Sequence, residues 1–166
     1  MRALMLSLAV AVPALLVGCN NANPTKPAAE TGPIYPTGSA AVNAERLINA
    51  DREPGSWLAT GLNYHEDRFS KLEQINDANV SNLGLAWYAD IDTERGQEST
   101  PIIVDGALYL TTAWSMVKAY DIKSGAKLWE YDPKIDRAKG ADACCDVVNR
   151  GVAAWNGKIY LGALDG

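Results

Sequence analysis

Two copies of a short turn pattern, 51 residues apart, restrict the fold of this chain more than any other feature. The first copy contains Asp105-Gly106 and the second contains Asn156-Gly157, and apolar arms flank each pair. Asp-Gly and Asn-Gly pairs between such arms are typical of tight β-hairpins, because both central residues of the turn must adopt a positive φ. The sequence therefore predicts a hairpin at each copy.

Further strands are predicted around the first hairpin. Ser115–Asp121 and Lys127–Tyr131 have strand composition and are separated by a turn at Lys123–Ala126, whereas Leu83–Ile91 alternates with the period of a strand. Four short strands repeated at a period near fifty residues are typical of a β-propeller, in which neighbouring blades cover each other's faces. We predict an all-β fold that holds the first blade and part of the next. Two unrelated hairpins in a β-sandwich are the alternative.

The amino-terminal part divides into three regions. Residues 1–18 have a charged start and an apolar run, as in an export signal. Residues 19–41 are rich in proline and alanine and predict a tether, and residues 42–166 form the propeller region, beginning with a short helix that Asn43 caps. The residues Leu16-Val17-Gly18-Cys19 resemble a bacterial lipobox, which implies lipidation of Cys19. An ordinary signal peptide with a chance cysteine is the alternative.

This assignment implies a periplasmic protein anchored by lipid, and Asn20 after the cysteine favours the outer membrane. With Cys19 lipidated, two of the three cysteines remain, Cys144 and Cys145. An oxidising compartment would allow them to pair, although neighbouring Cα atoms lie only about 3.8 Å apart. These two thiols are not expected to hold zinc, because a structural zinc site needs four ligands and His65 is the single histidine. The net charge of −5 disfavours nucleic acid as a partner.

Four stretches carry a resemblance to a known family. Ala119–Trp129 resembles a tryptophan docking repeat, and Arg68–Trp87 resembles the segment that precedes the first blade. Gly96–Pro101 resembles a loop that presents a glutamate, and Cys144–Gly151 reads Cys-Cys-Asp-Val-Val-Asn-Arg-Gly. Together they resemble the pyrroloquinoline quinone (PQQ)-dependent quinoprotein and quinohaemoprotein alcohol dehydrogenases, whose propeller is eight-bladed.

The resemblance implies the roles of four residues. Glu98 would hydrogen-bond PQQ, Cys144 and Cys145 would form a vicinal disulfide against one face of its rings, and Arg150 would pair with a PQQ carboxylate. The alternatives are a solvated carboxylate, two idle thiols and a surface salt bridge. Asp146 and Asn149 belong to the same motif and would shape its loop, while His65, Trp114 and Trp155 are interpreted as structural.

The implied reaction is oxidation of an alcohol CH–OH group, with PQQ accepting a hydride beside Ca²⁺ and a cytochrome c receiving the electrons. The general base and the calcium ligands would lie after residue 166, so no catalytic or metal-binding residue is assigned here and the chain alone is expected to be inactive. One alternative is a non-catalytic outer-membrane propeller lipoprotein that acts as an assembly scaffold. Another is the remnant of a truncated gene.

Overall fold

The computed structural model describes residues 35–166. The expected signal peptide, the lipidation site Cys19 and most of the expected tether lie outside these residues. In the part of the chain that the structure describes, no helix is both long and apolar enough to cross a membrane.

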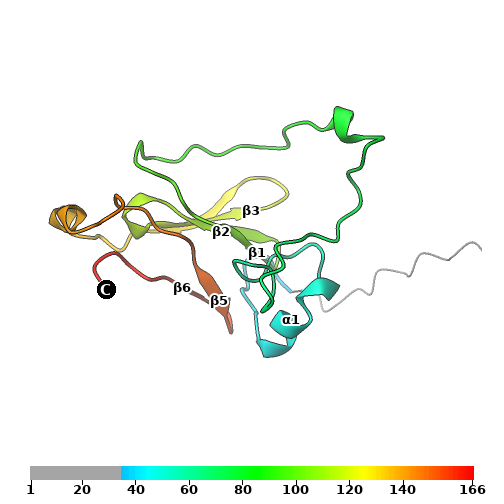
Figure 1. Ribbon diagram of the computed structural model, residues 1–166, viewed down its shortest axis with the longest axis horizontal. Helices are drawn as coiled ribbons and strands as arrows, with labels where there is room; N and C mark the ends of the chain where they lie inside the picture. Colours follow the sequence, from blue (N-terminus) through cyan, green and yellow to red (C-terminus); the bar gives the residue numbers. More distant parts are fainter. Residues whose placement is uncertain (1–34) are drawn as a thin grey trace, which may run out of the picture. The chain divides into compact units, whose positions relative to one another are not determined.

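A four-stranded antiparallel sheet forms the first blade (Figure 1). Its strands follow one another in chain order, which makes the sheet a meander. They are β1 (Ile102–Val104), β2 (Ala107–Thr111), β3 (Val117–Asp121) and β4 (Lys127–Tyr131). The four strands confirm the predicted blade.

The turns of this sheet follow from local chemistry. Asp105 and Gly106 join β1 to β2 with φ angles of 49° and 71°, as a tight hairpin requires. At the turn after β3, the Asp121 carboxylate accepts hydrogen bonds from the backbone N–H groups of Lys123 and Ser124, at 3.0 and 2.8 Å. Gly125 completes that turn at a φ of 71°. Each turn is encoded by residues inside it.

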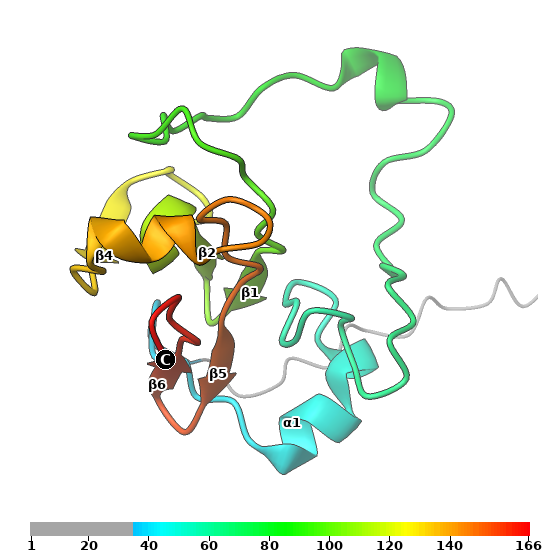
Figure 2. The same cartoon turned by 60° about the vertical axis from the view of Figure 1, so that its left-hand side comes forward.

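The second copy of the turn pattern forms its own hairpin, labelled β5 and β6 in Figure 2. Strands β5 (Ala153–Trp155) and β6 (Lys158–Tyr160) pair antiparallel across Asn156-Gly157, whose φ angles are 46° and 76°. This hairpin is the start of a second blade, so the chain is part of a β-propeller as predicted.

The hydrophobic core lies where the sheet, the β5–β6 hairpin and the segment before α1 meet. Its fully covered side chains include Val42, Leu58, Ile102, Val104 and Tyr109. Trp155 and Ile159 of the second hairpin pack against this cluster. Because one core serves both hairpins, the first blade and the start of the second are one packed unit.

The last residues of the predicted tether contact this packed unit. Gly38 donates its backbone N–H to Asp105 O at 2.9 Å, and Gly157 donates to Ala40 O at 2.9 Å. Ala40 is only 2% exposed. Composition suggested a spacer, but small residues here let the backbone approach two hairpin turns closely.

The predicted helix is present as α1 (Ala44–Ile48), followed by a 3-10 turn at Ala50–Arg52. Asn43 caps it as predicted, because its side-chain oxygen accepts the backbone N–H of Arg46 at 2.9 Å. A further 3-10 turn lies at Val80–Asn82. These helical turns are short, and the one at Val80–Asn82 buries none of its residues.

The strand predicted over Leu83–Ile91 is absent from the described structure. Figures 1 and 2 draw this region as a trace with no arrow. Leu85 is 80% exposed, and only Trp87 docks, donating its indole N–H to Ile122 O at 2.9 Å and covering Gly125. Alternation predicts which side chains share a face, but a strand also needs a neighbouring edge for its backbone groups, and no such pairing forms here.

Candidate functional site

Two of the predicted cofactor-binding residues meet although they lie far apart in the chain. Arg150 Nη2 lies 2.9 Å from Glu98 Oε2. Glu98 comes from the loop before β1 and Arg150 from the loop before β5. Their side chains are 44% and 71% exposed, so both remain accessible to a ligand.

The backbones of these two loops run in contact. Thr100 donates its N–H to Arg150 O at 3.1 Å. Gly151 has a φ of 132°, and a Cβ atom built there would lie 2.9 Å from Thr100 O. Only glycine fits this close approach without displacing the backbone of the facing loop. The glycine after Arg150 therefore lets the Arg150 loop lie against the Glu98 loop.

Asn149 fixes the loop from inside, as its place in the motif suggested. Its amide nitrogen donates to Ser115 Oγ at 3.2 Å and to Gly162 O at 2.8 Å, and its amide oxygen accepts from Gly151 N at 3.1 Å. Thr111 Oγ1 donates to Asn149 O at 3.1 Å. Asn149 thus ties the loop to the first blade and to the residues after β6.

Cys144 and Cys145 are exposed free thiols in this structure, with their Sγ atoms 2.7 Å apart. A disulfide bond is about 2.05 Å long, so the expected bond is not formed, and it stays a prediction for the oxidised protein. The hydrogen bond and the negative charge of Cys144 are the main causes that raise the pKa of the Cys145 thiol. The positive charge of Arg150 lowers that pKa and the negative charge of Glu98 raises it. The charges of both residues therefore act on Cys145.

Asp146 is held by Arg95, which was not among the predicted site residues. Arg95 Nε donates to both carboxylate oxygens of Asp146, at 2.9 and 3.2 Å, and a second nitrogen of the same guanidinium also donates. The backbone N–H of Gly96 adds a bond at 3.3 Å. The bonds from Arg95 are the main cause that lowers the pKa of the Asp146 carboxyl to about 2.

Trp114, interpreted as structural, lies under the same loop. Its backbone N–H donates to Val147 O at 2.8 Å, and the guanidinium carbons of Arg137 and Arg95 lie 4.2 and 5.9 Å from its ring centroid. Arginine above an indole ring is a favourable cation–π arrangement. The sequence signal for Arg95 was its place three residues before Glu98, whereas nothing local indicated Arg137.

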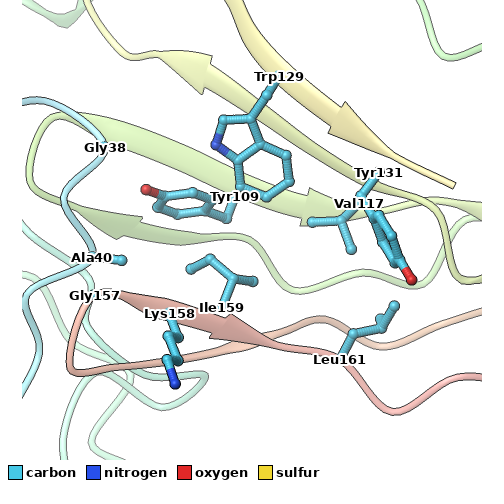
Figure 3. A pocket seen from close by; sticks show the side chains of 10 residues that line it. All are labelled: Gly38, Ala40, Tyr109, Val117, Trp129, Tyr131, Gly157, Lys158, Ile159 and Leu161. Atoms are coloured by element: carbon cyan, nitrogen blue, oxygen red, sulfur yellow. The ribbon is translucent and has the colours of Figure 1, made fainter. Parts of the chain in front are cut away.

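A groove elsewhere contains none of the predicted site residues. It encloses about 570 Å³ between the first blade and the β5–β6 hairpin, where Figure 3 shows Trp129 and Tyr109 facing Ile159. The Tyr109 hydroxyl is buried there without a hydrogen-bond partner. With one unpaired phenol and otherwise mainly apolar walls, this groove is a packing surface between blades, not a place for redox chemistry.

The predicted residues fit an anionic planar cofactor. Arg150 presents an exposed guanidinium that matches a carboxylate, and two exposed sulfur atoms lie in the same motif. Glu98 beside them can accept a hydrogen bond. Among residues 35–166 no three His, Cys, Asp or Glu side chains gather as they would around a metal ion.

Comparisons with known proteins identify the family. Residues 57–162 match the PQQ family, the beta-propeller domain of glucose, ethanol and alcohol dehydrogenases. The chain belongs to this family of PQQ-dependent dehydrogenase propellers. The resemblance drawn from the four sequence stretches is thereby confirmed.

Individual relatives are similar over most of the chain. The quinohemoprotein alcohol dehydrogenase ADH-IIG of Pseudomonas putida is 54% identical over 127 residues, which are 76% of this chain and 18% of that protein. The 1-butanol dehydrogenase (cytochrome c) of Thauera butanivorans is 51% identical over 112 residues, 68% of this chain and 16% of that protein. The chain therefore spans less than a fifth of the length of these relatives.

Solved structures of dehydrogenases are also similar to this chain. The structure of ADHIIG from Pseudomonas putida HK5 superposes with a TM-score of 0.75 at 51% identity, covering 81% of this chain and 19% of the other. A europium-containing methanol dehydrogenase superposes with a TM-score of 0.68 at 43% identity, covering 74% and 22%. Both likenesses combine fold with sequence and support the propeller assignment.

Proposed function

We propose that this chain forms one side of the PQQ site of an enzyme that oxidises alcohols. The observation that carries the proposal is the Arg150–Glu98 ion pair, 2.9 Å long, whose arginine lies in the loop that also carries Cys144 and Cys145. This exposed site combines an arginine, a carboxylate and a pair of sulfur atoms. Such a site is better suited to binding a flat, anionic redox cofactor than to binding a protein partner. The names of the relatives support an alcohol as substrate.

Each residue has a separate task in this proposal. Arg150 binds a carboxylate of the cofactor through its planar fork of donors. Glu98 orients the ring edge by hydrogen bonding, and Cys144 and Cys145, joined as a disulfide in the oxidised protein, cover one ring face. When bound, PQQ supplies the hydride-accepting chemistry, while the protein supplies position and electrostatics.

Other parts of the proposal concern what lies beyond these residues. We place a Ca²⁺ ion and the general base on parts of the propeller that follow residue 166, and the metal-containing methanol dehydrogenase supports a metal ion there. The 166-residue chain alone would then not oxidise alcohols. The ring would have eight blades.

The electron acceptor and the location are proposed from the same resemblance. A relative named for cytochrome c supports a cytochrome c as acceptor. The lipobox at Cys19 supports lipid anchoring in the periplasm, at the outer membrane. Globomycin, which blocks lipoprotein signal cleavage, should cause the precursor to accumulate if Cys19 is lipidated.

The activity is tested with the protein expressed from its complete gene and supplied with PQQ and Ca²⁺. Alcohols should then reduce an artificial dye, and PQQ should quench the protein's tryptophan fluorescence on binding. Arg150→Ala should weaken the quenching, whereas Lys158→Ala, outside the site, should not. A protein that neither binds PQQ nor oxidises alcohols would leave the scaffold role as the better explanation.

A further inference from the structure

Asp146 connects the two loops of the site. It directly follows Cys145, and its carboxylate is held by Arg95 and Gly96 at the start of the Glu98 loop. Arg95 reaches both carboxylate oxygens, at 2.9 and 3.2 Å from Nε. The two segments that carry the predicted cofactor residues are therefore joined by side chains outside the proposed cofactor contacts.

The backbone at Asp146 needs such support. Its φ is 68°, in the left-handed region that costs L-residues free energy. Aspartate tolerates this region better than most residues because its short polar side chain can be bonded locally. Here the bonds come from Arg95 and Gly96, which compensate for the unfavourable backbone directly after the cysteine pair.

The residues after Asp146 are held as well. Val147, the next residue, is fully buried and accepts a hydrogen bond from Trp114 N at 2.8 Å. Gly96 approaches so closely that a Cβ atom there would lie 3.1 Å from a methyl carbon of Val148. The residues after Cys145 are thus fixed by several contacts, and rotation of the cysteine pair would disturb these contacts.

We propose that Arg95 and Asp146 are positioning residues that hold the Cys144–Cys145 pair in register with Glu98 and Arg150 for cofactor binding. Neither needs to touch the cofactor, because Arg95 acts through Asp146 and the loop that follows. The inference rests on the proposed function for its link to PQQ. The other part of the inference, that Arg95 and Asp146 set the position of the cysteine pair, does not depend on PQQ.

The test uses Arg95→Gln, Asp146→Asn and the double variant in the protein expressed from its complete gene. Two quantities are measured: the PQQ dissociation constant by fluorescence quenching, and the rate at which reduced Cys144 and Cys145 react with a thiol reagent. Each single variant should raise the dissociation constant about tenfold, as expected for losing a charge-assisted bond, and should change the thiol rate. The double variant should resemble the singles, because both remove the same interaction.

Two controls isolate the effect. Arg68→Gln removes an exposed pair with Glu66 away from the site and should change neither quantity. Asp146→Asn keeps a residue that tolerates positive φ, so an unchanged unfolding midpoint would show that the effect is local.

The outcomes separate the two proposals. Wild-type affinity and wild-type thiol rates in both single variants would overturn the positioning role. If the unaltered protein does not bind PQQ, the proposed function fails, and the thiol rates alone decide whether Arg95 and Asp146 set the register of the cysteines.

Discussion

The Arg46 guanidinium lies 2.9 Å from Asp105 Oδ1 in the interior, where the two side chains are 7% and 1% exposed. The contact is an ion pair that links α1 to the β1–β2 turn, and it is not aligned as a hydrogen bond. The same guanidinium donates to both carboxylate oxygens of Glu53, at 2.8 and 2.6 Å. One buried cation therefore serves two carboxylates.

Replacing Arg46 with alanine should destabilise the fold strongly. The change leaves Asp105 buried without its cation, a loss of about 3 kcal/mol in the free energy of unfolding. Urea denaturation monitored by tryptophan fluorescence measures it. Arg52→Ala, an exposed arginine in the next turn of the chain, should stay within about 0.5 kcal/mol of the parent, and equal effects from the two variants would contradict the role of Arg46.

Arg150→Lys should weaken PQQ binding although the charge is kept. Lysine is a point charge and cannot reproduce the planar two-donor contact with a carboxylate. We expect a rise in the dissociation constant of about tenfold, measured by fluorescence titration, in line with charge-assisted hydrogen bonds. Equal affinity of the lysine variant would show that Arg150 supplies charge alone.

Gly151→Ala should disrupt the site more than a glycine replacement elsewhere. The new methyl group would meet Thr100 O at 2.9 Å and the backbone would be held at a φ of 132°. A cost of about 1–3 kcal/mol follows for such backbone strain, with weaker PQQ binding as the loops separate. Gly84→Ala is the control, because no atom lies within 4 Å of its added methyl group.

The contact between Arg95 and Asp146 should persist to low pH. The pKa of the Asp146 carboxyl is lowered from 3.8 to about 2, so the stabilisation is complete above the unfolded value and disappears as the pH falls through the folded one. The NMR chemical shift of the Asp146 carboxyl carbon is assigned by the absence of its signal in Asp146→Asn. This chemical shift should titrate near pH 2. In Arg95→Gln the same carbon should titrate closer to 3.8, and an unchanged midpoint there would rule out Arg95 as the cause.

Leu83–Ile91 should become a strand when a partner edge is present. In the described structure its apolar side chains, such as Leu85, are exposed. Hydrogen exchange should be fast for these amides in the 166-residue chain and slow in the protein expressed from its complete gene. The amides of β2, paired on both sides, should be protected in both, and equal exchange at Leu85 in the two proteins would mean that the alternation has another cause.

These cases show which features a sequence can predict. The hairpins were predictable because Asp105-Gly106 and Asn156-Gly157 encode their turns locally. The helix cap at Asn43 was predictable for the same reason. In contrast, the alternation from Leu83 predicted a strand that the described structure does not contain.

Long-range electrostatics could not be predicted. No local sequence feature predicted the burial of Arg46, because it depends on Asp105, which arrives from a distant turn. Arg95 has no local motif, and its role depends on Asp146 reaching it across the site. Glu98 and Arg150 were selected through family resemblance, and the structure adds that they are direct neighbours.

The segment before α1 has a consequence for the order in which the protein forms. Gly38 bonds to Asp105 O, and Asn156 N donates to Val42 O at 2.8 Å, so one short stretch meets both hairpin turns. The ribosome produces this stretch before either hairpin, so each new turn can dock on a backbone that already exists. We therefore expect an insertion between Gly38 and Val42 to displace one blade from the other instead of lengthening a linker.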